Sequence, residues 1–121
     1  MTSTPVRPTE IRLTKDRRTL VVSFVGGEHH ELSAEYLRVM SPSAEVQGHS
    51  PAERKTVGGK RDVEIIGVEP VGNYAVRLRF DDLHDTGIYT WSHLAELGRD
   101  HLPLWGRYLD ELAAKGLKRE K

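Results

Sequence analysis

The residues best suited to chemistry stand together in segment 82–91, which reads Asp-Leu-His-Asp-Thr-Gly-Ile-Tyr-Thr-Trp. Asp82 and Asp85 flank His84, so an imidazole and two carboxylates, which can ligate a metal or transfer a proton, precede a short aromatic strand pattern. The sequence around them has no nucleophile elbow, phosphate-binding loop or complete set of metal ligands. We therefore expect the protein not to be an enzyme.

A second pair of possible metal ligands is His29 and Glu31, whose H-x-E spacing is that of iron oxygenases with two histidines and one carboxylate. In a strand, both side chains would project from the same face. If His30 and Leu32 point into the core, that face is exposed to solvent and offers no sheltered third ligand. A polar strand face is the simpler interpretation.

A third group consists of His93, Glu96 and Asp100, which are spaced to line one side of a helix. The second histidine of a metalloprotease helix is missing, so these residues are predicted to form a solvated surface. Serine and histidine are frequent elsewhere, but nothing in their spacing brings a Ser-His-Asp triad together.

The segment 54–61 is locally basic and ends in Gly-Gly-Lys-Arg. This ending is similar to that of a phosphate-binding loop, but Arg54 replaces the first glycine and Arg61 replaces the magnesium-binding hydroxyl. Eighteen basic residues balance eighteen acidic ones, so no net field attracts the chain to nucleic acid or an anionic membrane. We expect a solvated loop, with weak nucleic-acid binding through 54–61 as an alternative.

Length and composition limit the class of protein. The 121 residues suffice for one domain and one core, but not for a second catalytic domain. Cysteine is absent, which removes disulfides, thiol nucleophiles and cysteine-bound zinc or iron–sulfur clusters. The apolar runs are far shorter than the ~20 residues of a membrane helix, and the N-terminus lacks the apolar core of a signal peptide. A cytoplasmic protein without a membrane span is expected.

The elements that position these groups begin with a predicted β-meander. Apolar residues alternate in 11–13 and 20–24, which indicates two strands joined by a turn. Gly26 and Gly27 provide two positive-φ positions for a hairpin into a third strand, 28–32. Ser33 is suited to cap a short helix that extends to about Met40.

Residues 41–62 lack periodicity, and Val46 and Val57 are their only sizeable apolar residues, so a long loop is expected. The patterns that follow predict a strand pair, 63–71 and 73–80, that turns at Gly72. A further short strand is predicted at 88–91.

Two helices are predicted at the end of the chain. Ser92 would cap the first helix and Gly98 would end it, while Pro103 would begin the second and Gly116 would end it. Gly106 inside the second helix suggests a close backbone approach. We expect this helix to dock on the sheet through an apolar stripe, with a Glu111–Lys115 ion pair on its surface. The stripe consists of Trp105, Tyr108, Leu109, Leu112 and Ala113.

Together these patterns predict an α+β fold with a mainly antiparallel sheet of about five or six strands. A short helix would follow the first meander, and the C-terminal helices would pack on the sheet. Residues 9–116 are expected to form a single domain that includes the long loop 41–62, with flexible tails at 1–8 and 117–121.

Several segments resemble the gamma-butyrobetaine hydroxylase-like N-terminal domain, a family long described as a domain of unknown function. The similar segments are 37–43, 65–80 and 84–94, and the resemblance extends from about residue 9 to 112. Its most specific element is the pattern Asp-x-His-x-x-Gly-x-Tyr-x-Trp. In this sequence the pattern is Asp82, His84, Gly87, Tyr89 and Trp91.

The resemblance implies an accessory role. In the carnitine-synthesis hydroxylase that names the family, a similar domain precedes a separate 2-oxoglutarate-dependent oxygenase domain that holds the iron. This sequence ends before any such domain, so we expect no hydroxylase activity. Other relatives are small stand-alone bacterial proteins or are fused behind Mrp-like ATPases that handle iron–sulfur clusters. These contexts imply an adaptor linked to iron–sulfur or metal metabolism, with an unknown protein partner.

The resemblance also raises the question of zinc. The hydroxylase version binds structural zinc through three cysteines just after a Leu-Arg dipeptide and a histidine in the later block. The matching positions here are Ser41, Ser43 and Val46, while His84 keeps the place of the histidine. Two hydroxyls and a valine cannot replace three thiolates, so a tight zinc site should be absent and no cofactor is expected. Instead, the His84 imidazole is predicted to hydrogen-bond the Ser41–Ser43 loop.

The main prediction is therefore a small non-enzymatic accessory or binding domain. One alternative stays open at this point, namely a weaker metal site formed by His84 with Asp82, Asp85 or His49. With such a site, the protein would be a metal-dependent enzyme that uses His84 and neighbouring carboxylates.

Overall fold

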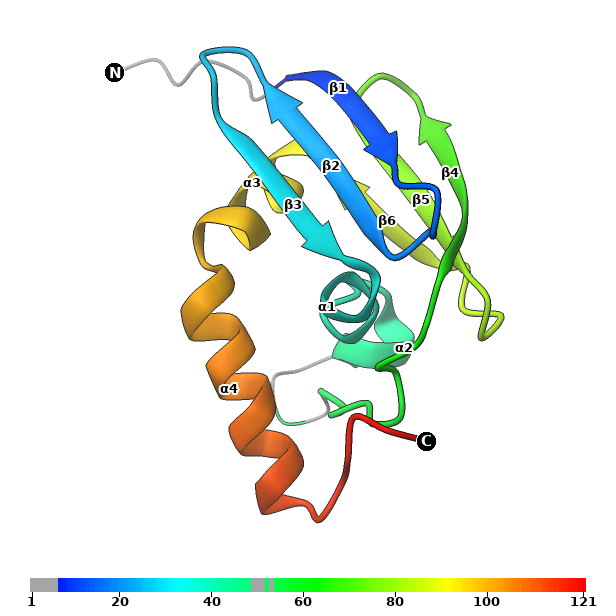
Figure 1. Cartoon of the computed structure of the whole chain (residues 1–121), viewed down its shortest axis with the longest axis vertical. Helices are drawn as coiled ribbons and strands as arrows, with labels where there is room; N and C mark the ends of the chain where they lie inside the picture. Colours follow the sequence, from blue (N-terminus) through cyan, green and yellow to red (C-terminus); the bar gives the residue numbers. More distant parts are fainter. Residues whose placement is uncertain (1–6, 49–51, 53) are drawn as a thin grey trace.

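A computed structural model describes residues 7–48, 52 and 54–121, and within these residues the chain forms six strands and four helices (Figure 1). The α+β class is as predicted, but the strands form two three-stranded antiparallel sheets rather than one sheet. The chain leaves the first sheet through two short helices and a long loop before the second sheet begins. Side chains from both sheets pack into one hydrophobic cluster, and the Ile65 amide at the start of β4 donates to the Arg17 carbonyl in the β1–β2 turn at 2.8 Å.

The first sheet is the predicted meander. Its strands are β1 (Pro8–Leu13), β2 (Thr19–Phe24) and β3 (His29–Ser33), and β2 lies between the other two. Gly26 and Gly27 have φ values of 97° and 96°, as the hairpin prediction requires. Leu20, Val22 and Leu32 are fully buried, which fixes the register because a slip by one residue would expose them.

Two short helices follow β3. Helix α1 (Ala34–Val39) is capped as predicted, since the Ser33 hydroxyl accepts a hydrogen bond from the Tyr36 amide at 3.0 Å. The long-loop prediction for 41–62 is wrong at its start, where α2 (Ala44–Gln47) forms one turn capped by Ser43. Val46 on that turn is buried, so a single apolar side chain fixes a segment too short to show periodicity.

The second sheet consists of β4 (Ile65–Val71), β5 (Ala75–Phe80) and β6 (Gly87–Thr90), with β5 in the centre. The β4–β5 connection turns at Gly72, whose φ of 53° matches the predicted turn. Val76, Leu78 and Phe80 are buried, but Tyr74 lies in the turn and is 55% exposed instead of continuing their alternation.

Helix α3 (Trp91–Arg99) differs from the prediction at both ends. Its cap is Thr90, whose hydroxyl accepts from the His93 amide at 3.1 Å, because Thr90 is the last extended residue of β6. Gly98 lies inside the helix and does not end it. A Cβ at Gly98 would lie 2.3 Å from Cγ of His30, so this glycine lets α3 cross β3 closely.

Helix α4 (His101–Ala114) packs through a narrower stripe than predicted. Tyr108 and Leu112 are buried, but Leu109 and Ala113 are exposed, so only one side of the helix is covered. The predicted close approach at Gly106 is wrong, because no atom lies within 4 Å of a Cβ built there. Gly116, with a φ of 66°, follows the helix end as predicted.

The predicted Glu111–Lys115 pair is replaced by contacts with the loop. Glu111 forms an ion pair with Arg54 and accepts a hydrogen bond from the Thr56 hydroxyl at 3.4 Å. Lys115 Nζ lies 2.9 Å from the same hydroxyl. Tertiary partners on residues 54–56 therefore take the place of the local helix pair.

Residues 117–121, predicted to be a flexible tail, make defined contacts beside α1 and α4. Arg119 binds the buried Glu35 carboxylate through two hydrogen bonds of 2.7 and 2.9 Å, and its guanidinium lies 5.3 Å from the ring centre of Trp105. The Gly59 amide donates to the Lys118 carbonyl at 2.8 Å. Residues 1–6 of the other predicted tail lie outside the described residues, and Pro8 already belongs to β1.

Three buried tyrosines connect the layers through their hydroxyl groups. Tyr36 donates to the Leu97 carbonyl at 2.6 Å, Tyr89 donates to the Leu37 carbonyl, and Tyr108 donates to the Val57 carbonyl at 2.6 Å. Each bond satisfies a backbone acceptor inside the core. In the described part of the chain, no helix combines the length and the apolar character needed to cross a bilayer.

Candidate functional site

The chemically suited residues of segment 82–91 sit on a tight turn, residues 81–85, that follows β5. The Phe80 amide donates to the His84 carbonyl and the Leu83 amide to the Phe80 carbonyl, both at 3.0 Å. Leu83 has a φ of 74°, which is a left-handed conformation that a leucine rarely adopts. The Asp82 side chain accepts from the His84 amide at 3.1 Å, so the turn is closed by its own polar groups.

The His84 imidazole is held at both ring nitrogens. Nε2 lies 2.9 Å from the Ser41 hydroxyl and Nδ1 lies 3.0 Å from the Glu45 carboxylate. The predicted hydrogen bond to the Ser41–Ser43 loop is therefore present. Only 3% of the side chain is exposed. Burial lowers the pKa of His84, and the nearby Arg38 charge acts in the same direction, while Glu45 and Asp82 oppose it.

The residues at the positions of the family's zinc ligands do not fit that metal. Ser41 and Ser43 present hydroxyls, which bind His84 and, at 2.7 Å, Thr86. Val46 presents only methyl groups and is buried in the core. Zinc of the structural type needs charged, soft donors. Among the described residues, no three His, Cys, Asp or Glu side chains converge as a metal site would require.

The carboxylates suggested as metal ligands together with His84 make other contacts or face solvent. Asp82 binds Arg38 Nε at 2.7 Å and Lys60 Nζ at 2.6 Å, while Asp85 is exposed on the turn. Burial raises the pKa of Asp82, but the hydrogen bonds from Lys60, the His84 amide and Arg38 outweigh it and lower the pKa to about 2. The third suggested partner, His49, lies outside the described residues.

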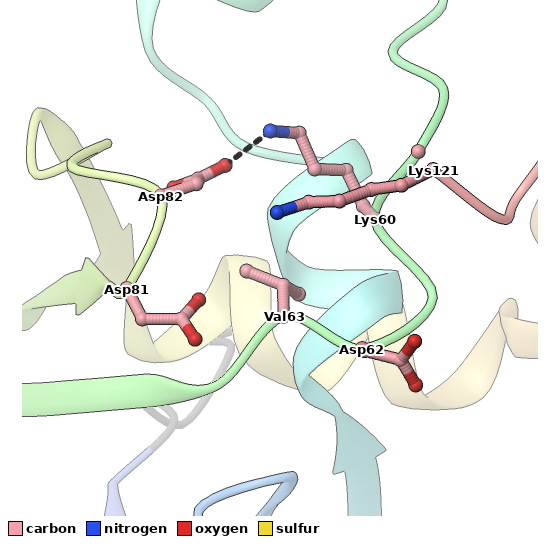
Figure 2. A pocket seen from close by; sticks show the side chains of 7 residues that line it. Lys60, Asp62, Val63, Asp81, Asp82 and Lys121 are labelled. Carbon is pink, nitrogen blue, oxygen red and sulfur yellow. Dashed lines mark ion pairs between the residues drawn. The ribbon is translucent and has the colours of Figure 1, made fainter.

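A hollow of about 280 Å³ opens beside Asp82 (Figure 2). Figure 2 shows Lys60 and Lys121 reaching over it, with Val63 at its base and Asp62 pointing away. Asp81 and Asp82 set two negative charges against the two lysines, while Asp62 pairs with Arg18 at 3.3 Å. The hollow is therefore neither a clear anion site nor a clear cation site.

The basic segment 54–61 is largely neutralised by carboxylates. Arg54 pairs with Glu111, Lys60 with Asp82, and Arg61 with Glu120 at 2.9 Å. These partners compete with phosphate for the same cations.

The pair His29 and Glu31 lies on the exposed face of β3, as predicted, while Leu32 points into the core. His29 Nε2 and the Glu31 carboxylate are 3.7 Å apart, and the Ser23 hydroxyl lies 2.9 Å from His29 Nδ1. The pair is thus a polar strand face.

The surface predicted for His93, Glu96 and Asp100 is only partly correct. Glu96 and Asp100 are exposed, but His93 is half-buried and its Nε2 is completely buried. The His93 ring lies 6.0 Å from the Tyr89 ring of β6 and lines a hollow with Met40 and Leu104, so helical spacing within α3 alone did not reveal its burial.

Leu83 is the feature that the sequence patterns missed. It is 86% exposed although it occupies the centre of a turn whose neighbours Asp82 and His84 are both anchored. Its only signal was a large apolar residue inside a polar turn.

Comparison with known proteins gives matches over most of the chain. The sequence profile of a family described as "Gamma-butyrobetaine hydroxylase-like, N-terminal" matches residues 11–95. A protein solved in solution by NMR is 45% identical, with 97% of this chain and 92% of that chain covered and a TM-score of 0.84. A second NMR structure is also 45% identical, covers 98% of this chain and 90% of that chain, and has a TM-score of 0.81.

A third similar structure is a crystal structure of a protein of unknown function from Acidithiobacillus ferrooxidans, which belongs to the DUF971 family. It is 39% identical, covers 76% of this chain and 92% of that chain, and has a TM-score of 0.63. A comparison with curated proteins finds no match.

Proposed function

The chain belongs to the gamma-butyrobetaine hydroxylase-like N-terminal family, and from this premise we propose that it is a non-enzymatic accessory domain that binds a protein partner through the turn 81–85. The family that the 82–91 pattern predicted is thereby confirmed. The observation that carries the proposal is the exposure of Leu83 at the tip of a rigid turn.

The turn combines three properties of a contact site. Leu83 offers a large exposed apolar side chain, and its burial in a pocket of the partner would remove apolar surface from water, which favours binding. Asp85 is exposed and offers a negative charge at the rim of the proposed interface. The anchors of Asp82 and His84 hold the turn in one conformation, so little entropy is lost on binding.

The conformation of Leu83 supports the same conclusion. A left-handed leucine costs roughly 1 kcal/mol, and an exposed side chain recovers none of this through packing. Backbone strain of this kind gathers at sites of function. Leu83→Asn should therefore raise the free energy of unfolding by ~0.5–1 kcal/mol, because asparagine tolerates this conformation better.

The polar groups nearby support a structural role more than catalysis. Both nitrogens of His84 are already bonded, and Asp82 is neutralised by two cations. A metal-dependent enzyme would need to break these contacts before His84 or Asp82 could bind metal or substrate. Weak nucleic-acid binding would likewise have to displace the carboxylates that pair with segment 54–61.

The finer part of the proposal concerns the partner. The family contexts that include ATPases of iron–sulfur cluster handling favour a partner from iron–sulfur or metal metabolism. The mixed charges around the hollow beside Asp82 would border such an interface and set its orientation.

The test is affinity purification of the full chain from native cells with mass spectrometry, run in parallel on the unaltered protein, Leu83→Ser and Leu102→Ser. Leu102 is a matched control, because it is 82% exposed on α4, outside the turn. We expect a protein to be captured by the unaltered chain and by Leu102→Ser but lost with Leu83→Ser. Capture that is equal in all three samples would contradict a role for the turn. An iron–sulfur assembly ATPase among the Leu83-dependent proteins would support the finer proposal.

A further inference from the structure

The outer side of α4 carries an apolar stripe. Leu102 and Leu109 are 82% and 38% exposed, and Gly106 and Ala113 are exposed as well. Spacings of four, three and four residues place these positions on one side of the helix. Tyr108 packs inward from another side, and Figure 1 shows α4 at the margin of the molecule, with its outer side away from both sheets. We call residues 102, 106, 109 and 113 the α4 stripe.

Large and small residues alternate along the α4 stripe, which makes it complementary to its own reverse. In an antiparallel pair of α4 helices related by a twofold axis, Leu102 faces Ala113 of the second copy. In the same pair Leu109 faces Gly106 of the second copy, where a Cβ would meet no atom of its own chain within 4 Å. Each large side chain therefore meets a small one, as closely packed helices require. A parallel pair would set leucine against leucine and glycine against glycine.

The charges beside the α4 stripe agree with the antiparallel arrangement. Arg107 and Asp110 are exposed on one flank, and neither takes part in an ion pair among the described residues, whereas Glu111 pairs with Arg54. About the same twofold axis, Arg107 of each copy is offset by only ~3 Å along the helix axis from Asp110 of the other. An arginine side chain spans this offset, so opposite charges meet at the rim of the contact and orient the two copies.

We propose that two copies of the chain associate through the α4 stripe as an antiparallel dimer. Burial of Leu102 and Leu109 against the small positions of the other copy removes exposed apolar surface from water, which favours association. The helix of 14 residues is only ~21 Å long, so the contact is smaller than the ~1,200 Å² of a standard stable interface, and the dimer is weak and reversible. The contact is separate from the partner site proposed at Leu83.

Sedimentation equilibrium of the full chain between ~1 µM and ~1 mM tests the association. We expect a reversible monomer–dimer equilibrium that Gly106→Arg weakens at least ~10-fold, because a long charged side chain would stand in the centre of the contact. Open space at Gly106 lets the monomer accept this change, and urea unfolding of the dilute variant checks its fold. Leu83→Ser is the control and should dimerise like the unaltered chain. A chain that stays monomeric throughout, or a dimer that tolerates Gly106→Arg, would overturn the proposal.

Disulfide cross-linking tests the orientation, because the chain contains no cysteine of its own. Leu102→Cys and Ala113→Cys variants are oxidised separately and as a mixture, at a concentration at which the dimer forms. The antiparallel dimer brings position 102 of one copy to position 113 of the other, so disulfides should form in the mixture. Two copies of position 102 lie ~16 Å apart along the helix axis, beyond the reach of a disulfide, so Leu102→Cys alone should not cross-link. Efficient cross-linking of Leu102→Cys alone would indicate a parallel pair and overturn the proposal.

Discussion

The Nε2 atom of His84 lies 2.9 Å from the Ser41 hydroxyl, although 43 positions separate the two residues in the chain. This bond joins the turn after β5 to the loop after α1. The loop is itself closed by a bond of 3.2 Å from the Ser43 amide to the same Ser41 hydroxyl. A histidine and two serines thus hold together two segments that the hydroxylase version of the domain is expected to join through zinc.

His84→Ala should lower the free energy of unfolding by ~2–3 kcal/mol, because it removes two hydrogen bonds and leaves a cavity. It should not change the metal content. Urea unfolding and elemental analysis of protein purified without a histidine tag measure both quantities. His29→Ala, which removes an exposed histidine from β3, is the control and should change stability by less than ~0.5 kcal/mol. A stoichiometric metal that disappears only in His84→Ala would contradict the structural role.

Asp82 should make stability depend on acid pH. Its pKa is lowered to about 2 in the folded protein, below its value in the unfolded chain, so its contribution is present above pH ~4 and is lost as the pH falls toward 2. This contribution is ~2 kcal/mol. The difference in unfolding free energy between the unaltered protein and Asp82→Asn should therefore narrow between pH 4 and 2. The exposed Asp85→Asn serves as control, and an equal narrowing for it would contradict the assignment.

Two helical glycines should respond in opposite directions to alanine. Gly98→Ala would place a methyl group against the His30 ring and should destabilise the fold by ~1–3 kcal/mol. Gly106→Ala meets open space inside α4 and should stabilise it by up to ~1 kcal/mol through helix propensity. Thermal and urea unfolding measure both. Equal effects at the two positions would show that α3 does not cross β3 as closely as described.

Arg119→Ala should destabilise the fold by ~3 kcal/mol, because it leaves the buried Glu35 carboxylate unpaired. Arg61→Ala breaks an exposed pair with Glu120 and should cost less than ~1 kcal/mol. Urea unfolding of both variants makes the comparison. If Glu35→Gln combined with Arg119→Ala restores most of the lost stability, the unpaired charge is the cause; no restoration would point to another role of Arg119.

Local patterns predicted the elements well where the cause is local. Gly26, Gly27 and Ser33 act on their immediate neighbours, so the hairpin and the start of α1 were predictable from spacing. The division into two sheets, the cap at Thr90 and the course of α3 past Gly98 depend on which segments meet in space, and spacing carries no information on this.

The candidate site was predicted in the same uneven way. The bond of His84 to the Ser41–Ser43 loop was foreseen because family resemblance places these positions together, whereas periodicity alone could not. The burial of His93 and the exposure of Leu83 were missed. The burial of His93 depends on the approach of α1 and α4, and the exposure of Leu83 depends on a left-handed backbone. Neither can be predicted from the residue type alone.

The Glu35–Arg119 pair has a consequence for synthesis of the protein. Glu35 belongs to the second quarter of the chain, and its partner follows 84 residues later. On the ribosome, the first sheet and α1 can form early, but Glu35 stays without its charge partner until residue 119 has been made and has left the exit tunnel. Domains that fold during synthesis keep such late contacts for the end. The complete fold therefore forms only after residue 119 has left the exit tunnel, and a nascent chain halted before Arg119 should be a preferred substrate for chaperones.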